Sequence, residues 1–192
     1  ALLMPDSEAY IDAVLAGDRD AFRHLVRLHK DSAWGIALSV LKDAFTARDA
    51  VQQAFVQAWL HLGSFRREAS FRTWLHRIVI REALKLAKEQ QQHTADFADI
   101  ADIPDLQPPE SGGELRDAHQ RYYINQALTR LDARESLVLK LFYLEAYSIR
   151  EISQLTAWSE SHVKVLLYRA RQNMRVLLEK TFRLKPEDLY LP

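Results

Sequence analysis

The side chains best suited to bind a ligand lie between residues 159 and 175, where apolar residues recur at a spacing of three to four. Such a spacing predicts a helix with one buried face. Ser159 directly precedes the pattern and is expected to cap the helix. The other face is predicted to carry cations and a phenol: Lys164, Tyr168, Arg169 and Arg171. Groups of this kind bind phosphates and base edges, so the segment is expected to contact nucleic acid.

A shorter helix is predicted directly before this one. Ser148 and Glu151 form an S-x-x-E capping box, and apolar residues follow on one side of residues 149–155. Residues 156–158 then interrupt the pattern. Two short helices around a tight turn are typical of a helix-turn-helix motif, whose second helix enters a DNA groove.

A second cationic segment begins in the polar loop at residues 64–70 and continues into a long helix. Aromatic residues interleaved with cations suit single-stranded DNA, because rings stack on exposed bases while cations bind phosphates. Phe71 and Trp74 are expected to be mostly buried, so Phe65 and the arginines are the better ligand candidates. The arginines of this segment are Arg66, Arg67, Arg72, Arg77 and Arg81.

The elements that position these side chains are predicted to be helices only. The chain has 192 residues, of which 48% are hydrophobic, and it contains few glycines and prolines. Long segments carry helical periodicity and no convincing alternating strands occur, so the expected fold class is all-α. At this length the chain is expected to form two small domains.

The formal net charge of zero conceals a segregation of charge. Residues 66–92 and the segment after residue 162 are rich in cations, whereas residues 93–118 are acidic and contain prolines and glycines. This distribution predicts two basic helical units, 1–92 and 119–192, joined by an acidic flexible linker at 93–118. Two such units could bind one polyanion at two places. The alternative is that these charges only solvate the surface.

The first unit is predicted to contain four helices, the last of them the one that follows the loop at residues 64–70. One covers residues 7–16 and ends at Gly17, and another covers residues 20–42. The third is expected to run from residue 46 to 62, with Thr46 and Asp49 as a variant capping box and Gly63 as its stop. Its polar side is rich in glutamine and could form hydrogen bonds with a protein partner, although an ordinary solvated face is equally consistent with the pattern.

Several classes of function are disfavoured. The chain has no cysteine, its histidines lack metal-ligand spacing, and it has no glycine-rich phosphate loop. We therefore expect no enzymatic activity, catalytic residue, metal, cofactor or small-molecule substrate. The longest apolar run, residues 34–41, is too short to cross a bilayer, and the amino end does not resemble a signal peptide. A soluble, cytoplasmic protein is expected.

Four segments in order resemble the bacterial RNA polymerase sigma factors of the extracytoplasmic-function group, and the resemblance covers nearly the whole chain. The segments are residues 20–43, 47–66, 69–84 and 131–153. The resemblance implies that units 1–92 and 119–192 are sigma domain two and sigma domain four. It also implies three partners: core RNA polymerase, promoter DNA and an anti-sigma factor, which in this group is often membrane-anchored. The acidic linker would run through the polymerase toward its active cleft.

The resemblance also implies roles for individual residues. The set at or beside the polymerase-binding surface is Asp49, Gln52, Gln53 and Phe55. The set that would receive the melted minus-ten strand is Phe65, Arg66, Arg67, Ser70, Trp74, Arg77 and Arg81. The set that would contact the minus-thirty-five element is His162, Lys164, Val165, Tyr168, Arg169 and Arg171, the last as a phosphate contact.

The chain departs from the usual pattern of the group at several positions. Gln53 stands where glutamate is usual, Arg67 where glycine is common, and Arg81 where asparagine is frequent. Cations are frequent at the positions of Ile80 and Leu166. Because these positions lie in the predicted DNA-binding and polymerase-binding segments, base preference cannot be transferred from the group. At the helix-turn-helix corner, Thr156 and Ala157 replace a common Leu-Gly pair.

The main alternative is a stand-alone helix-turn-helix regulator, which would bind duplex DNA without polymerase and normally as a dimer. No obvious dimerisation heptads occur, and this alternative leaves the arginine-aromatic segment unexplained. Two questions stay open at this point. The two units could be separate or folded on each other, and residues 182–192 could pack on the last domain or bind a partner.

Overall fold

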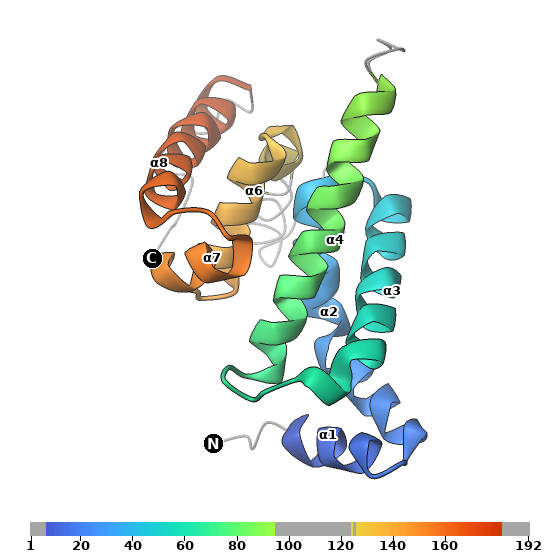
Figure 1. Cartoon of the computed structure of the whole chain (residues 1–192). Helices are drawn as coiled ribbons and strands as arrows, with labels where there is room; N and C mark the ends of the chain where they lie inside the picture. The colour runs from blue at the N-terminus through green and yellow to red at the C-terminus, as the bar shows by residue number, and fades with distance from the viewer. Residues whose placement is uncertain (1–6, 95–123, 125, 182–192) are drawn as a thin grey trace, which may run out of the picture.

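The computed structural model describes residues 7–94, 124 and 126–181. Every regular element within these ranges is helical, so the prediction of an all-α fold is confirmed (Figure 1). Most of the predicted acidic linker and the carboxy-terminal segment 182–192 lie outside the described residues.

The first half of the molecule, residues 7–94, is built on three packed helices (Figure 1). Helices α2, α3 and α4 contact one another, and α1 lies across one end of them. Short 3₁₀ turns, η1 and η2, precede α2 and follow α3. The bounds are α1 Ser7–Leu15, η1 Arg19–Ala21, α2 Phe22–Leu41, α3 Ala44–His61, η2 Leu62–Ser64 and α4 Phe71–Thr94.

Local capping explains where α3 begins. The Asp43 carboxylate accepts hydrogen bonds from the Thr46 backbone N–H at 2.7 Å and from the Thr46 hydroxyl at 2.6 Å. Since Asp43 is the cap, the helix begins at Ala44, and the predicted capping box of Thr46 with Asp49 is wrong. Gly17 adopts φ 108° after α1, as its predicted role as a stop requires.

The second half, residues 126–181, contains the predicted helix-turn-helix. Ser148 and Glu151 form both hydrogen bonds of the capping box, and Ser159 caps the second helix through the His162 N–H, so both capping predictions are confirmed. Ala157 adopts φ 60° at the corner between them. The bounds are α6 Ala133–Leu139, the π-helical turn η3 Lys140–Leu144, α7 Ile149–Thr156, α8 Glu160–Val176 and the π-helical turn η4 Leu177–Thr181.

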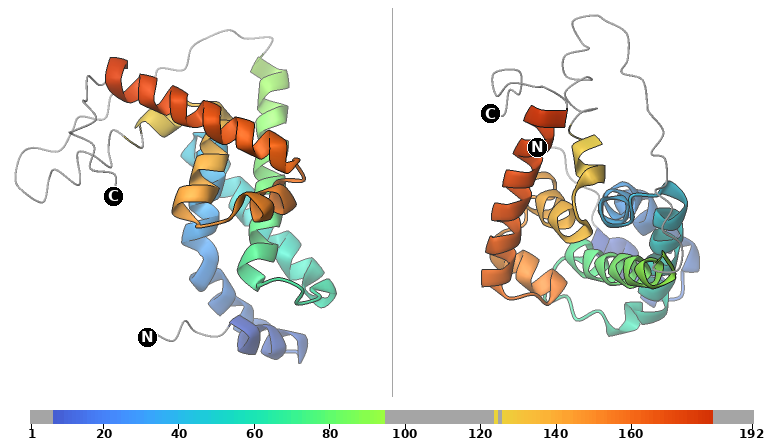
Figure 2. Two further views of the ribbon diagram at one scale, coloured as in Figure 1. Left: turned by 90° about the vertical axis from the view of Figure 1, so that its left-hand side faces the viewer. Right: turned by 90° about the horizontal axis from the view of Figure 1, so that it is seen from above.

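The two halves are folded on each other. Seen from above, α6, α7 and α8 lie together on one side of α2 and α4, whereas α3 lies on the far side (Figure 2). Helix α6 contacts α2, and α7 contacts α4. Buried residues of both halves belong to one continuous apolar core. The sequence left open whether the two units are separate or folded on each other, and these contacts show that they are folded on each other.

Candidate protein-binding and nucleic-acid-binding surfaces

The outer face of α3 combines amides with exposed apolar side chains. Asp49, Gln52 and Gln53 are exposed, as expected. Phe45 is 73% exposed and Leu60 65% exposed, and helical spacing places both on the same side as these polar residues. Val56 is also exposed on this side. Sequence reasoning missed the three apolar residues because it considered only the polar side chains on this side of the helix.

Phe55 does not belong to this outer face. It is buried, and its ring packs edge-on against Phe22 at 6.5 Å between centroids. Phe55 therefore supports α3 from its buried side. An open groove lies beside the face, between α2 and α3, and is lined by Lys30, Asp31, Trp34, Arg48, Val51 and Gln52.

Phe65 begins the loop that precedes α4 and packs on the first turn of that helix. Its ring lies 6.0 Å from the ring of Phe71 and 5.1 Å from that of Trp74. Phe71 is fully buried, while Phe65 and Trp74 are half-buried. Ser70 accepts a hydrogen bond from the Thr73 N–H at 3.2 Å, which caps the start of α4. Phe65 and Trp74 thus form a partly open aromatic surface beside a capped helix end.

Arg67 occupies an unusual position in this loop. It adopts φ 58°, a left-handed conformation that costs a residue other than glycine about 1–2 kcal/mol. Its guanidinium pairs with two carboxylates of α1, lying 3.2 Å from Glu8 and also contacting Asp12. The backbone conformation matches the observation that glycine is common here in the family that the sequence resembles. The side chain is directed toward α1.

A row of exposed cations runs along α4. Arg77 and Arg81 are exposed, and Lys85 and Lys88 continue the row at helical spacing. Ile80 is 1% exposed and belongs to the core, so a cation at that position would be buried in this fold. Arg66 is exposed in the loop before the helix.

The outer side of α8 carries all six residues predicted for duplex recognition, and each is exposed. Val163, Leu167 and Ala170 are buried on the inner side, as the periodicity predicted. Leu166 is also buried, which explains an apolar residue there. The exposed set is His162, Lys164, Val165, Tyr168, Arg169 and Arg171.

Two cations of α8 are bound by neighbouring elements. Arg171 donates from Nε to the Tyr143 hydroxyl at 2.7 Å, and its guanidinium lies 5.7 Å from the centre of the Phe142 ring. Arg169 lies 3.7 Å from the buried carboxylate of Glu135. Sequence reasoning missed these partners because they lie in α6 and η3, about 30 residues away along the chain. Their effect is to restrict both guanidiniums before any ligand binds.

Other kinds of site find no support in the described residues. No group of three or more histidine, aspartate or glutamate side chains in that part of the chain could bind a metal ion. None of the described helices combines the length and apolarity that a membrane span requires.

Comparison with known proteins places these surfaces in a family. Residues 25–93 match the family model Sigma-70 region 2, and residues 121–174 match Sigma-70, region 4. The ECF RNA polymerase sigma factor SigM of Mycobacterium tuberculosis is 29% identical over 86% of this chain and 81% of its own length. The ECF RNA polymerase sigma factor SigW of Bacillus subtilis is 28% identical over 86% of this chain and 92% of its own length.

Solved structures share the fold. The sigma factor RpoE from Bartonella quintana, in complex with the anti-sigma factor NepR, gives a TM-score of 0.65 at 20% identity, covering 83% of this chain and 97% of that one. CnrH in complex with the cytosolic domain of CnrY gives 0.60 at 23% identity, covering 89% and 96%. The two family models, in this order and together covering most of the chain, show that it is a sigma factor of the sigma-70 family, and its similarity to SigM and SigW places it in the extracytoplasmic-function group.

Proposed function

We propose that the protein is an alternative sigma factor, which binds core RNA polymerase and directs it to specific promoters. The observation that carries this proposal is the combination of three surfaces on one chain. These are the apolar and amide face of α3, the cation row of α4 with its aromatic loop, and the cationic outer side of α8. Residues 1–92 would act as sigma domain two and residues 119–192 as sigma domain four.

Core polymerase would bind the outer face of α3. Burial of the exposed Phe45 and Leu60 side chains would supply apolar free energy of about 25 cal/mol per Å². Asp49, Gln52 and Gln53 would form hydrogen bonds around them. An amide at Gln53, where the family usually has a carboxylate, gives up one charge-assisted contact but is less costly to desolvate.

The melted minus-ten strand would lie on the loop and the outer side of α4. A base turned out of the stack would contact the half-buried rings of Phe65 and Trp74. The exposed row that begins with Arg77 and Arg81 would bind the phosphates on either side. Arg66 and Ser70 lie at the edge of the same surface.

The minus-thirty-five element would accept α8 in its major groove. Lys164, Val165 and Tyr168 lie on the exposed side of the helix, where they would contact base edges and thymine methyl groups. Arg171, already bound by Tyr143, would contact a phosphate without further ordering of its side chain. His162 and Arg169 flank this set.

We further propose that an anti-sigma factor regulates the protein. The support is that RpoE of Bartonella quintana, which shares this fold, was solved with the anti-sigma factor NepR, and that CnrH, which also shares it, was solved with the cytosolic domain of CnrY. The anti-sigma factor would bind surfaces that the polymerase also needs. The protein would act in the cytoplasm as an initiation factor without catalytic activity of its own.

Size-exclusion chromatography with bacterial core polymerase, followed by transcription from a pool of genomic fragments, tests the proposal. Co-elution and new discrete start sites are expected. The double variant Phe45→Ser, Leu60→Ser is expected to weaken core binding by at least tenfold, since buried interface anchors contribute more than about 1 kcal/mol each. Leu15→Ser, an exposed leucine of α1, is the control. A folded protein that ignores core polymerase and binds duplex DNA as a dimer would favour the stand-alone regulator.

A further inference from the structure

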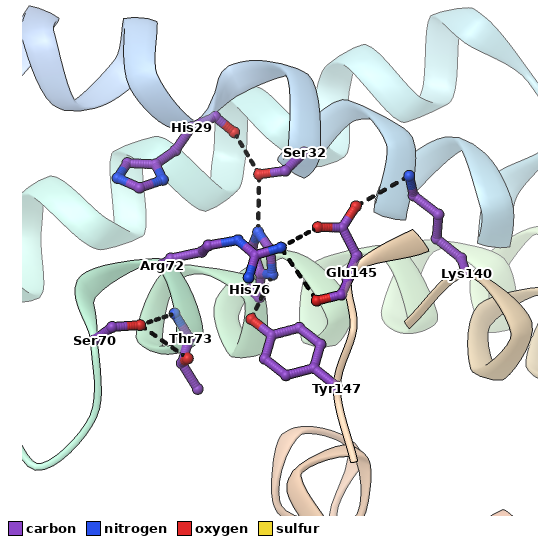
Figure 3. Close-up of polar contacts among 9 residues, drawn as sticks. All are labelled: His29, Ser32, Ser70, Arg72, Thr73, His76, Lys140, Glu145 and Tyr147. Carbon is purple, nitrogen blue, oxygen red and sulfur yellow. Dashed lines mark hydrogen bonds and ion pairs between the residues drawn. The ribbon is translucent and has the colours of Figure 1, made fainter. Parts of the chain in front are cut away.

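A buried polar cluster joins the two halves of the molecule (Figure 3). The Tyr147 hydroxyl, from the second half, lies 2.9 Å from Nδ1 of His76 on α4. Nε2 of the same ring lies 2.9 Å from the hydroxyl of Ser32 on α2. Tyr147 is 5% exposed and His76 0% exposed. A histidine that is fully buried in domain two therefore takes one of its two hydrogen bonds from domain four.

The direction of these hydrogen bonds can be assigned. Burial, aided by the charge of Arg72, lowers the pKa of His76 to about 3, so the ring is neutral near pH 7. The Ser32 hydroxyl donates to the His29 carbonyl at 3.2 Å. Nε2 of His76 must then donate to Ser32, which leaves Nδ1 to accept the hydrogen bond from Tyr147. Among the described residues, the phenol is the group of the second half that forms a hydrogen bond with the His76 ring (Figure 3).

Glu145 makes a second connection beside the first. Its side chain is 6% exposed and lies between two cations: Oε2 is 2.5 Å from Arg72 of α4, and Oε1 is 3.0 Å from Lys140. Arg72 also lies over the ring of Tyr147, 5.3 Å from its centre. The Lys140 side chain packs against α2 at Gly35. A Cβ added to Gly35 would lie only 2.8 Å from the ammonium nitrogen of Lys140. The absence of a side chain at Gly35 thus leaves room for Lys140.

Only one of the two ion pairs of Glu145 crosses between the halves. Lys140 belongs to the same half as Glu145, so the carboxylate would retain a cation if the halves separated. Arg72 would be released on α4, next to the exposed surface described above. Buried ion pairs contribute little net stability because desolvation offsets the Coulomb attraction. These polar groups therefore make the contact between the halves specific, while the shared apolar core supplies most of the attraction between them.

On the proposed function, the protein binds two promoter elements at the same time. The closed arrangement does not allow this. Elements near positions minus ten and minus thirty-five lie about 25 base pairs apart, or about 85 Å at 3.4 Å per base pair. Helix α4, the longest element, has 24 residues and spans only about 36 Å. Halves that touch through Tyr147 and His76 are too close to reach both elements at once.

We propose that Tyr147 and Glu145 form an intramolecular latch, which holds domain four on α2 and α4 and keeps the free chain closed without any anti-sigma factor. The latch competes with promoter DNA for Arg72, because a phosphate can replace the Glu145 carboxylate as its partner. Opening is then part of the assembly of the initiation complex. A chain that is mostly closed binds in proportion to its small open fraction.

The test measures the distance between the halves in the free protein. The chain has no cysteine, so Glu89→Cys and Gln172→Cys, both at exposed positions, allow specific labelling for pulsed EPR or single-molecule fluorescence. The labelled parent is expected to show one short distance. Adding Tyr147→Phe and Glu145→Gln is expected to raise the ratio of open to closed molecules about tenfold. An unchanged distance distribution in this folded double variant would overturn the latch.

Two further variants separate the latch from a general loss of structure. Arg72→Gln removes the same ion pair from the domain-two side at a half-exposed residue and is expected to open the chain as well. Tyr143→Phe removes an exposed phenol of the same domain and is expected to leave the closed distance unchanged. Opening by Tyr143→Phe, or none with Arg72→Gln, would count against the latch. Because these distances are measured without polymerase or DNA, a failure of core binding would refute the proposed function and leave this result standing.

Discussion

The two cationic regions of the molecule differ in what binds their arginines. In α8, Arg171 is bound by Tyr143 of the same half, so the DNA-facing side chains are arranged by the domain that carries them. In α4, Arg72 is bound by Glu145 of the other half. On the proposed function, the outer side of α8 is formed before DNA arrives, whereas promoter binding would have to break the contact between Arg72 and Glu145.

The loop before α4 extends this difference. Arg67 is bound by Glu8 and Asp12 of α1, an element that packs across one end of the three central helices. The region proposed to capture a melted strand thus has two of its cations, Arg67 and Arg72, paired with internal carboxylates while the protein is free. In α8, the carboxylate of Glu135 lies 3.7 Å from Arg169 but belongs to the same half of the molecule. The physical distinction is between a preformed surface and one whose ligand displaces internal carboxylates.

The largest effect is expected from deleting a buried side chain beneath α8. This variant tests whether the domain itself supports the outer side of that helix. Leu167→Ala deletes a fully buried side chain and is expected to lower the free energy of unfolding by about 2–5 kcal/mol, as measured in urea. Leu144→Ala, at an exposed leucine, is the control and should change it by less than about 0.5 kcal/mol. Equal losses in the two variants would show that α8 is not supported by its inner face.

Glu135 tests whether the domain itself orients a cation of α8. Glu135→Gln weakens the contacts to Arg169 at 3.7 Å and to Asn173 at 3.0 Å, and should cost about 1–3 kcal/mol of stability. Affinity of the holoenzyme for minus-thirty-five duplex, measured by fluorescence anisotropy, should fall several-fold. Glu160→Gln, at an exposed glutamate of α8, should change neither quantity. Unaltered duplex affinity in Glu135→Gln would mean that Arg169 needs no orientation.

The sequence predicted the parts of this arrangement that depend on neighbouring residues. The capping box of Ser148 with Glu151 and the cap at Ser159 were confirmed, because each motif satisfies its own backbone groups within three residues. The start of α3 was missed because Asp43, just outside the predicted helix, accepts the hydrogen bond of the Thr46 N–H and so begins the helix at Ala44.

Contacts between distant segments could not be predicted in the same way. Arg72 and Glu145 are 73 residues apart, and Arg67 and Asp12 are 55 apart. Nothing in either local pattern shows which carboxylate each arginine binds. The exposed Phe45 and Leu60 of α3 illustrate the same limit, since exposure of an apolar residue follows from how the helices pack and not from its type.

The dependence of α4 on the other half of the molecule can also be tested by lowering the pH. Burial lowers the pKa of His76 to about 3 from its ordinary 6.5, so between these values the unfolded chain binds a proton that the native chain does not. Stability therefore falls as the pH drops below 6.5. From pH 7 to 5.5 the loss should be about 1 kcal/mol, measured by urea unfolding.

The charged and titratable neighbours of His76 define the control for this experiment. Arg72, His29 and Lys140 all lower its pKa, and the pKa of His29 is itself lowered by burial. His76→Gln should therefore remove most, not all, of the loss between pH 7 and 5.5. A pH dependence that is the same in His76→Gln and the parent would mean that the ring is not the group responsible.

The smallest effect is expected at Arg67, where two terms oppose each other. Arg67→Gly relieves a left-handed backbone that costs about 1–2 kcal/mol. It also removes exposed ion pairs to Glu8 and Asp12, which solvent screens and which therefore contribute little. Because glycine adds chain entropy to the unfolded state, the net change in the free energy of unfolding should stay within about 1 kcal/mol. Arg66→Gly, whose backbone is not left-handed, lacks the compensating gain and should destabilise the protein more. A loss above 2 kcal/mol in Arg67→Gly alone would show that α1 stabilises the loop structurally, and the contrast between a preformed α8 and a neutralised loop would then fail at this residue.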